Sequence, residues 1–495
     1  MAGSRLLALV GGALAGLALP PLGSPPLLWL GLALLWHLSA RQRPWQLGGI
    51  WGLAAVLVSH RWLLGLHPLT WIGVPEPLSL PLCWLLLAIC AGAGGVLVGG
   101  WLSLAAWLGP RRSLAALAMA GLWGLVEVAL AKGPLFWIGI GAAALPGDRP
   151  LAGLAALVGA GGLAAVQLLV AWGLWRCLQH LTARRWRPFL LSGLVVALAV
   201  VGLQALGTRV LAAQPLEQTT VERVLVLQPA IPTREKFTWP QQLRLRQLLR
   251  AALAEGDQRQ ASTVLLPEGA LGLDPELDQP APVELISGGF RWQEVGGEPQ
   301  QRSALLRFPP GTVQPTDALD KHRVVPLGEW VPLAGLVRWS GLSAVGGVEP
   351  GPAPRLLQRP EASIAGAICY ELSDGEALAA ATRDGARWLL ASANLDPYPL
   401  MLQRQFSALA QLRAIETGRW LVSAANTGPS LLVNAQGELV AQLPAGRAVT
   451  GLFTVPQLSN LTFYARFGDG PLLLLTGAVG AAAVLSRVQG SRQPN

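Results

Sequence analysis

The first two hundred positions are dominated by apolar runs that are long enough to cross a lipid bilayer. A membrane-spanning helix needs about 17–25 mostly apolar residues. Such runs lie near residues 4–21, 26–40, 46–66, 79–108, 113–131, 151–176 and 188–206, and an eighth lies near 471–485. The pattern predicts a membrane domain of about seven transmembrane helices over residues 1–206. Residues 468–495 are predicted to form a C-terminal transmembrane helix and a cytoplasmic tail.

The pattern of polar and apolar positions changes between residues 207 and 467. Charged residues become frequent, and short β-prone runs alternate with helical patterns. The predicted strands are Val221–Gln228, Ser262–Leu266, Ser303–Phe308, Ser363–Cys369, Arg387–Ala393, Trp420–Ala425, Leu431–Asn434 and Gly451–Val455. The predicted helices are Pro240–Glu255 and Leu402–Thr417, and residues 271–300 are expected to form a surface excursion. The alternation predicts one α/β domain with helices packed on sheets.

The composition agrees with a membrane protein. Hydrophobic residues make up 52% of the chain and charged residues 13%, which is about half the charged share of an ordinary soluble protein. The net charge of +9 does not indicate nucleic-acid binding, because the arginines lie largely in short clusters between the apolar runs. The four cysteines have neither disulfide nor zinc-site spacing, and we expect no metal and no cofactor.

The same clusters predict the orientation of the chain. Alternate ends of the apolar runs carry eleven arginines, whereas the opposite short loops carry only Arg61, Lys132 and Arg149. Loops rich in Lys and Arg stay in the cytoplasm. Seven crossings from a cytoplasmic N-terminus then place residues 207–467 on the outer side of the membrane.

Three ionisable groups follow β-prone runs or lie in a constrained loop, and together they suggest acyl transfer. Cys369 would attack a carbonyl carbon and form a thioester, and Glu268 would take the thiol proton and return it to the leaving group. Lys321 would stabilise the oxyanion together with the backbone N–H of Tyr370. Taken singly, each group has an ordinary interpretation as a buried thiol, a turn residue or a solvated charge.

Neighbouring residues refine this hypothesis. Glu329 lies eight residues after Lys321 and is expected to orient its ammonium group. A helix predicted over Glu371–Ala381 begins just after the thiol, and a helix N-terminus favours the thiolate. Glu127 lies inside an apolar run, where a carboxyl group serves either a structural hydrogen bond or substrate access.

The order and context of Glu268, Lys321 and Cys369 resemble those of the carbon–nitrogen hydrolase, or nitrilase, superfamily over about residues 221–455. This resemblance implies an αββα sandwich and a Glu-Lys-Cys triad. Two motifs, Gly-Glu-Trp-Val-Pro at 328–332 and Ile-Cys-Tyr-Glu at 368–371, resemble the bacterial apolipoprotein N-acyltransferase family. The Trp-x-x-x-Glu sequence at 123–127 in the membrane half does so as well.

The second resemblance carries expectations about chemistry and location. A phospholipid would donate a fatty acyl group to Cys369, and the α-amino group of a diacylglyceryl-modified apolipoprotein would then take it. Glu329, Tyr370 and Glu371 match positions important to the family's site. The resemblance also implies a multi-pass protein of the bacterial inner membrane with its catalytic domain on the periplasmic side.

The chain departs from the family pattern at several places. Asn394-Leu395-Asp396-Pro397 stands where Asn-Asp-x-Trp is usual, Phe406 where histidine is frequent, and Lys236-Phe237 where a Lys-Trp pair is frequent. Two other functions stay open on the sequence. One is a membrane-anchored amidase of the same superfamily that uses water as acceptor. The other is a non-catalytic transporter or scaffold, although no repeats or broken-helix pairs are evident.

Overall fold

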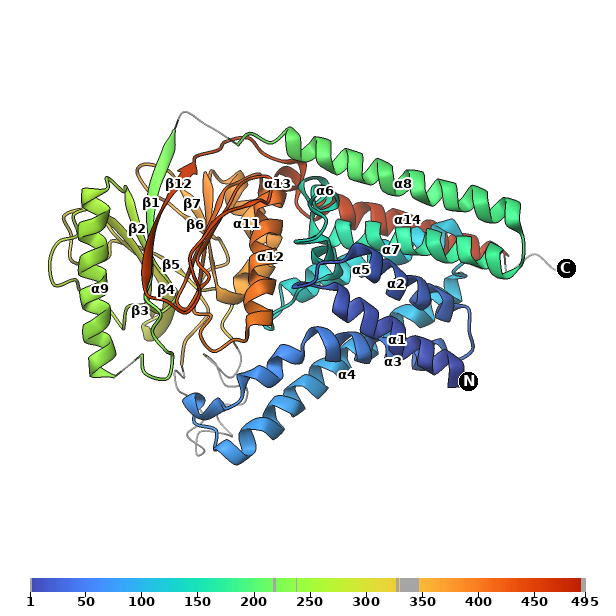
Figure 1. The fold of residues 1–495 in the computed structure, drawn as a ribbon, viewed down its shortest axis with the longest axis horizontal. Coiled ribbons are helices and arrows are strands. Elements are labelled where there is room, and N and C mark those ends of the chain that lie inside the picture. Colours follow the sequence, from blue (N-terminus) through green and yellow to red (C-terminus); the bar gives the residue numbers. More distant parts are fainter. Residues whose placement is uncertain (1, 217–219, 237, 326–328, 330–346, 491–495) are drawn as a thin grey trace.

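The computed structural model describes residues 2–216, 220–236, 238–325, 329 and 347–490. These residues form two halves that lie end to end, a bundle of long apolar helices and a β-rich domain (Figure 1). The predictions made on Phe237 and on the motif residues Gly328, Trp330, Val331 and Pro332 lie outside the described residues.

Each predicted apolar run corresponds to a helix. The helices are α1 (Ala2–Ala18), α2 (Pro25–Ser39), α3 (Pro44–Ser59), α4 (Glu76–Leu108), α5 (Ser113–Ala131), α7 (Ala155–Thr182), α8 (Trp186–Ala212) and α14 (Gly470–Gly490). Within the described residues, five of them (α4, α5, α7, α8 and α14) are long and apolar enough to cross a membrane. The run at 46–66 is longer than its helix, because the polar pair His60-Arg61 ends α3 and a short 3-10 helix, η1 (Arg61–Leu66), follows.

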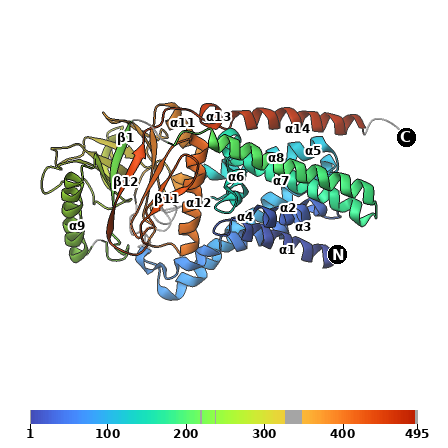
Figure 2. The ribbon, with the colours of Figure 1, turned by 45° about the horizontal axis from the view of Figure 1, so that its top comes forward.

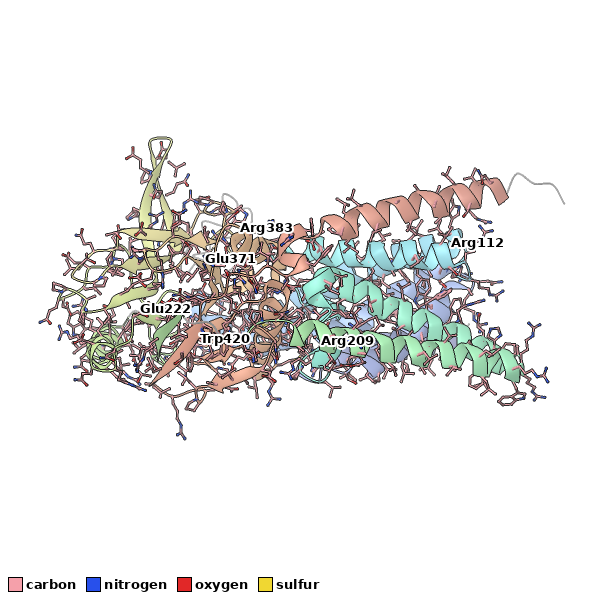
Figure 3. All side chains as sticks on the ribbon, turned by 90° about the horizontal axis from the view of Figure 1, so that it is seen from above. Arg112, Arg209, Glu222, Glu371, Arg383 and Trp420 are labelled. Carbon is pink, nitrogen blue, oxygen red and sulfur yellow. The ribbon has the colours of Figure 1, made fainter. Side chains whose placement is uncertain are left out.

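The helix bundle presents one end to the β-rich domain. Helix α14 returns beside α5 and α7 although it is distant in sequence (Figure 2). Arg112, between α4 and α5, lies at the end of the bundle remote from the β-rich domain, whereas Glu371 lies in that domain near the junction (Figure 3). The junction also contains η2 (Leu69–Ile72), η3 (Ile140–Ala144), α6 (Arg149–Ala152) and α13 (Phe463–Phe467).

Glu127 is hydrogen-bonded inside the bundle. Its Oε1 accepts a bond from the indole N–H of Trp123 (2.9 Å) and one from the backbone N–H of Ile140 (2.9 Å). A carboxyl group in an apolar surrounding is tolerated when its oxygens find donors. These bonds fix the segment after α5 against the helix and support the structural interpretation of Glu127.

The β-rich domain contains two six-stranded sheets. The first has the order β12-β1-β2-β3-β4-β5, with β1, β2 and β3 parallel to one another. Its strands are β1 (Val221–Gln228), β2 (Thr263–Leu266), β3 (Glu284–Val295), β4 (Glu298–Phe308), β5 (Asp317–Asp320) and β12 (Val449–Pro456). The second has the order β11-β10-β9-β8-β7-β6, with β7, β8 and β9 parallel. Its strands are β6 (Leu356–Leu357), β7 (Ile364–Ile368), β8 (Trp388–Ala393), β9 (Leu421–Ala425), β10 (Leu431–Val433) and β11 (Leu439–Gln442).

The two sheets pack face to face, and helices cover their outer surfaces. Helix α9 (Trp239–Gln258) packs on β1 and β2, while α11 (Gly375–Arg383) and α12 (Leu400–Thr417) pack on the second sheet. Contacts between β4 and β7 and between β1 and β9 join the sheets. This arrangement confirms the predicted αββα sandwich beside a helical membrane domain (Figure 1).

The surface excursion predicted over residues 271–300 is wrong for its second half. Residues 284–300 belong to the β3–β4 hairpin, in which Val295 pairs with Glu298 across Gly296-Gly297. Both glycines have positive φ, 62° and 85°, as a two-residue hairpin turn requires. The Gly-Gly pair was the signal for a hairpin, but the polar composition around it suggested a loop.

Candidate active site

Glu268 lies two residues after the end of β2, a parallel strand. A Cβ atom on Gly288 of β3 would lie 2.4 Å from the Cα of Glu268, so only glycine there allows the two strands to approach so closely. The Glu268 Oε1 accepts a hydrogen bond from the ammonium of Lys321 (2.6 Å). Its Oε2 accepts one from the backbone N–H of Asn394 (3.0 Å). The carboxylate is therefore held from both sides.

Lys321 follows β5 and is buried between two carboxylates. Its ammonium also donates to Glu329 Oε1 (2.8 Å), and Glu329 Oε2 accepts the backbone N–H of Val325 (2.8 Å). Burial by itself lowers the pKa of Lys321, but Glu268 and Glu329 outweigh it and raise the pKa well above its usual value. Burial raises the pKa of Glu329. Lys321 is thus a fixed cation, and Glu329 holds it, as the sequence predicted.

Cys369 directly follows β7 and has a backbone conformation that residues other than glycine rarely adopt. Its φ is +55°, and it begins a 3-10 turn, η5 (Cys369–Ser373). Such strain persists where the surrounding structure enforces it, commonly at active sites. Burial and the carboxylates of Glu268 and Glu329 raise the pKa of the thiol well above its usual value, against the effect of Lys321. The resting thiol is therefore protonated and needs a base.

The helix predicted over Glu371–Ala381 exists but starts four residues later than predicted, and the thiolate that its N-terminus was expected to favour is not supported, because the pKa of Cys369 is raised. Helix α11 begins only at Gly375, where the side chain of Asp374 caps it by accepting the Ala377 N–H (3.2 Å). The cap ends the turn that holds the thiol and starts a separate helix. The electrostatic effect on Cys369 comes instead from the buried carboxylates, which raise its pKa.

Glu371 braces the thiol turn from inside the fold. Its carboxylate accepts the backbone N–H groups of Ile368 (2.8 Å) and His322 (2.6 Å), and Arg355 donates to both of its oxygens (2.8 and 2.9 Å). Both side chains of the ion pair are 3% exposed. Glu371 therefore ties the loop that carries Lys321 to the strand end that carries Cys369.

We expect replacement of Arg355 by Met to lower the free energy of unfolding by about 3–5 kcal/mol, because Glu371 would keep a buried charge without its partner. Denaturant titration of the detergent-solubilised protein measures this change. The matched control is Arg259→Met, which breaks an exposed ion pair with Glu255 and should change the stability by less than about 1 kcal/mol. Equal losses in the two variants would contradict the bracing role.

The membrane half covers the thiol turn. The guanidinium of Arg323 donates to the backbone carbonyls of Gly133 and Leu135, which follow α5, and to the carbonyl of Tyr370 (3.1 Å). Phe136 packs between Tyr370 and Phe406, with ring centroids at 5.4 and 5.0 Å. Phe406, which stands where the family frequently has histidine, thus forms part of an apolar cover over the site.

A second aromatic contact reaches the site from η1. Trp62 packs edge-on against Tyr398 (6.1 Å), and Tyr398 lies 6.1 Å from the ring of Tyr370. Burial and the nearby Cys369 raise the pKa of Tyr370, so that its hydroxyl stays neutral. The thiol is therefore enclosed by aromatic rings from both halves of the chain.

The structure brings together every residue proposed for the site, and it adds several that the sequence did not reveal. Asn394 was noted only as part of a departure, yet its backbone N–H binds Glu268. Lys236 is half-buried beside Glu268 and Asp396; burial lowers its pKa to about 8, against the effect of both carboxylates. Arg355 lies in no sequence motif that could have revealed its role. In the part of the chain described, no group of three His, Cys, Asp or Glu residues is arranged to hold a metal ion.

Comparisons with known proteins show which family the chain belongs to. The family model described as carbon-nitrogen hydrolase matches residues 311–456. The chain is similar to the apolipoprotein N-acyltransferase of Prochlorococcus marinus, with 50% identity over 99% of the chain and 98% of the relative. It is 47% identical to that of Parasynechococcus marenigrum over 93% of the chain and 96% of the relative.

Similarity extends to a more distant relative and to solved structures. The apolipoprotein N-acyltransferase of Thermosynechococcus vestitus is 33% identical over 98% of the chain and 96% of its own length. The crystal structure of Saccharomyces cerevisiae Nit3, a member of the nitrilase superfamily, matches 48% of this chain and 90% of its own, with 16% identity and a TM-score of 0.35.

Proposed function

Because the chain belongs to the apolipoprotein N-acyltransferase family, we propose that it acylates the N-terminus of apolipoproteins through a thioester on Cys369. The acyl donor would be a phospholipid of the surrounding bilayer, and the acceptor the α-amino group of a diacylglyceryl-modified cysteine. The proposal rests on one observation above all. Glu268, Lys321 and Cys369 follow three different strands and meet in a buried cluster beneath the membrane half.

In the first half-reaction, Glu268 accepts the proton of the Cys369 thiol as the sulfur attacks the ester carbonyl of the phospholipid. The oxyanion develops beside the ammonium of Lys321 and the backbone N–H of Tyr370. Collapse of the intermediate breaks the ester C–O bond. The lysophospholipid oxygen leaves with the proton that Glu268 returns, and the acyl group stays on sulfur.

In the second half-reaction, the neutral α-amino group of the acceptor attacks the thioester carbonyl. Glu268 takes a proton from the attacking nitrogen, and the Cys369 sulfur leaves and recovers a proton, so that the thiol is restored. The aromatic cover formed by Phe136, Tyr370 and Tyr398 would keep water from the thioester. The thioester would then react with the acceptor amine rather than with water.

We further propose that the membrane half comprises residues 1–206, the catalytic domain 207–467 and the last membrane helix with its tail 468–495. The catalytic domain would face the periplasm of a bacterial inner membrane. Arg112 lies at the end of the bundle remote from the catalytic domain (Figure 3), and the first turn of α1 and the last turn of α14 lie on that side (Figure 1). Positively charged ends stay in the cytoplasm, which supports this orientation.

Mass spectrometry of the purified protein after incubation with phospholipid tests the proposed chemistry. We expect an acyl adduct on the peptide that contains Cys369, and its loss when a diacylglyceryl-cysteine peptide is added, with an amide product of matching mass. Adduct formation that yields only free fatty acid, even with the peptide present, would favour the amidase. No adduct at all would favour a non-catalytic protein.

A further inference from the structure

A cleft lies against α9, on the side of the catalytic domain away from the membrane helices. It has a volume of about 660 Å³ and is lined by Lys236, by one face of α9 and by the segment 269–282. We call it the α9 cleft. Its volume falls within the range of ligand sites, about 300–1,000 Å³. The length of the cleft, its apolar floor and the charges on its rim indicate which kind of ligand it binds.

One end of the α9 cleft lies beside the proposed base, although none of Glu268, Lys321 and Cys369 lines it. Lys236 lines the cleft, and its charge interacts with Glu268. A Cβ atom on Gly269, the residue after Glu268, would lie 2.8 Å from the Nζ of Lys236. The amine therefore packs on the backbone that carries the proposed base, and it is shared by the cleft and the site.

From this end the cleft runs along α9. Its wall extends from Gln242 to Asp257, which is roughly 22 Å at 1.5 Å per helical residue. An extended peptide rises about 3.3 Å per residue, so that the cleft has the length of about six or seven peptide residues. Figure 1 shows α9 on the side of the catalytic domain opposite the membrane helices.

The chemistry of the walls suits a polypeptide better than a lipid headgroup. Leu249, Leu253 and Leu277 form a buried apolar floor. The arginines of the rim, Arg246 and Arg250, both pair with Asp278, at 3.7 and 2.7 Å. Paired arginines offer no concentrated positive charge to a phosphate group, whereas an apolar floor with a polar rim is typical of peptide binding.

We propose that the α9 cleft binds the polypeptide of the acceptor, namely the residues that follow its lipid-modified cysteine. The inference rests on the proposed function and deepens it. With the α-amino group at Cys369 and the lipid chains in the bilayer, the peptide must leave the site on the side away from the membrane. The cleft that starts at Lys236 and Gly269 offers that path.

Two alanines of α9 give a matched test. Ala254 lines the cleft and Ala251 does not, and both are exposed. We expect Ala254→Trp to raise KM for a long diacylglyceryl-cysteine peptide by about tenfold, as expected for the loss of a few favourable contacts. KM for a diacylglyceryl-cysteine dipeptide, and the rate of adduct formation on Cys369, should not change. Ala251→Trp should leave all three unchanged.

If Ala254→Trp and Ala251→Trp behave alike with both acceptors, the α9 cleft does not hold the peptide. Failure of the wild-type protein to form the adduct would instead reject the proposed function, so the two failures are distinct. A photoreactive group near the end of the long peptide should label α9 or residues 269–282. Labelling elsewhere, or labelling of α9 by a phospholipid with the same group in its acyl chain, would overturn the proposal.

Discussion

Replacement of Cys369 by Ala is expected to abolish both the acyl adduct and transfer to the acceptor. Without the sulfur there is no nucleophile to accept the acyl group, and losses for removed nucleophiles reach the order of a million-fold in kcat. The loss should not reflect unfolding, because the change removes one buried atom from a turn that Glu371 and Arg355 brace. Intact-mass measurement and the initial rate of amide formation record the effect.

The matched control is Cys90→Ala. Cys90 is a free thiol like Cys369. It is half-buried in α4 of the membrane half, far in sequence from the catalytic cluster. The variant should form the adduct and transfer the acyl group at the wild-type rate. Transfer that persists in Cys369→Ala would reject the thioester mechanism, whatever the result with Cys90.

Replacement of Glu268 by Gln should lower the rate of adduct formation by about 10²–10⁴-fold, the usual contribution of a general base. The amide keeps the shape of the side chain and one acceptor for Lys321, so that phospholipid binding should be retained. Single-turnover mass spectrometry measures the adduct, and a flotation assay with vesicles measures binding. Unchanged turnover would rule out Glu268 as the base.

The pH dependence of the Glu268→Gln variant follows from the thiol. The variant loses one of the two carboxylates that raise the pKa of Cys369, but burial and Glu329 still raise it against the effect of Lys321, so that the thiol stays protonated at neutral pH. Without the base, only the thiolate fraction reacts, and this fraction grows as pH rises towards the thiol pKa. We therefore expect residual adduct formation to increase with pH. Glu255→Gln on the exposed α9 surface serves as the control with wild-type behaviour.

The pattern of β-prone and helical runs predicted an α/β domain because it depends on short-range sequence, whereas the αββα sandwich was implied by the resemblance to the nitrilase superfamily. The β-prone runs predicted at 221–228 and 387–393 coincide with β1 and β8 within a residue. Glu268 follows β2 by two residues and Cys369 follows β7 directly, and the ends of parallel strands gather at one edge of a sheet. The sequence placed Lys321 only in a loop, so that a meeting of the three groups was compatible with the sequence, and the structure brings them together.

Interactions between distant segments could not be predicted in this way. Arg355, just before the two-residue strand β6, reaches Glu371 across sixteen positions, and Arg323 reaches Gly133 across 190. Neither arginine is distinguished by its local sequence. The protonated thiol was also missed, because its pKa depends on burial and on two carboxylates that only the folded chain places nearby. Local pattern gives the framework, whereas electrostatics requires the three-dimensional arrangement.

The contacts of Arg323 affect any fragment that contains only the catalytic domain. Two of its acceptors, at Gly133 and Leu135, belong to the lipid-embedded half, and a third is the carbonyl of Tyr370 beside the nucleophile. A fragment that starts near residue 207 would lack these two acceptors and the ring of Phe136, so that the guanidinium of Arg323 would keep only its bonds to Tyr370 and Ser373. Removing the helices would therefore open one side of the turn that carries Cys369 as well as remove its access to lipid.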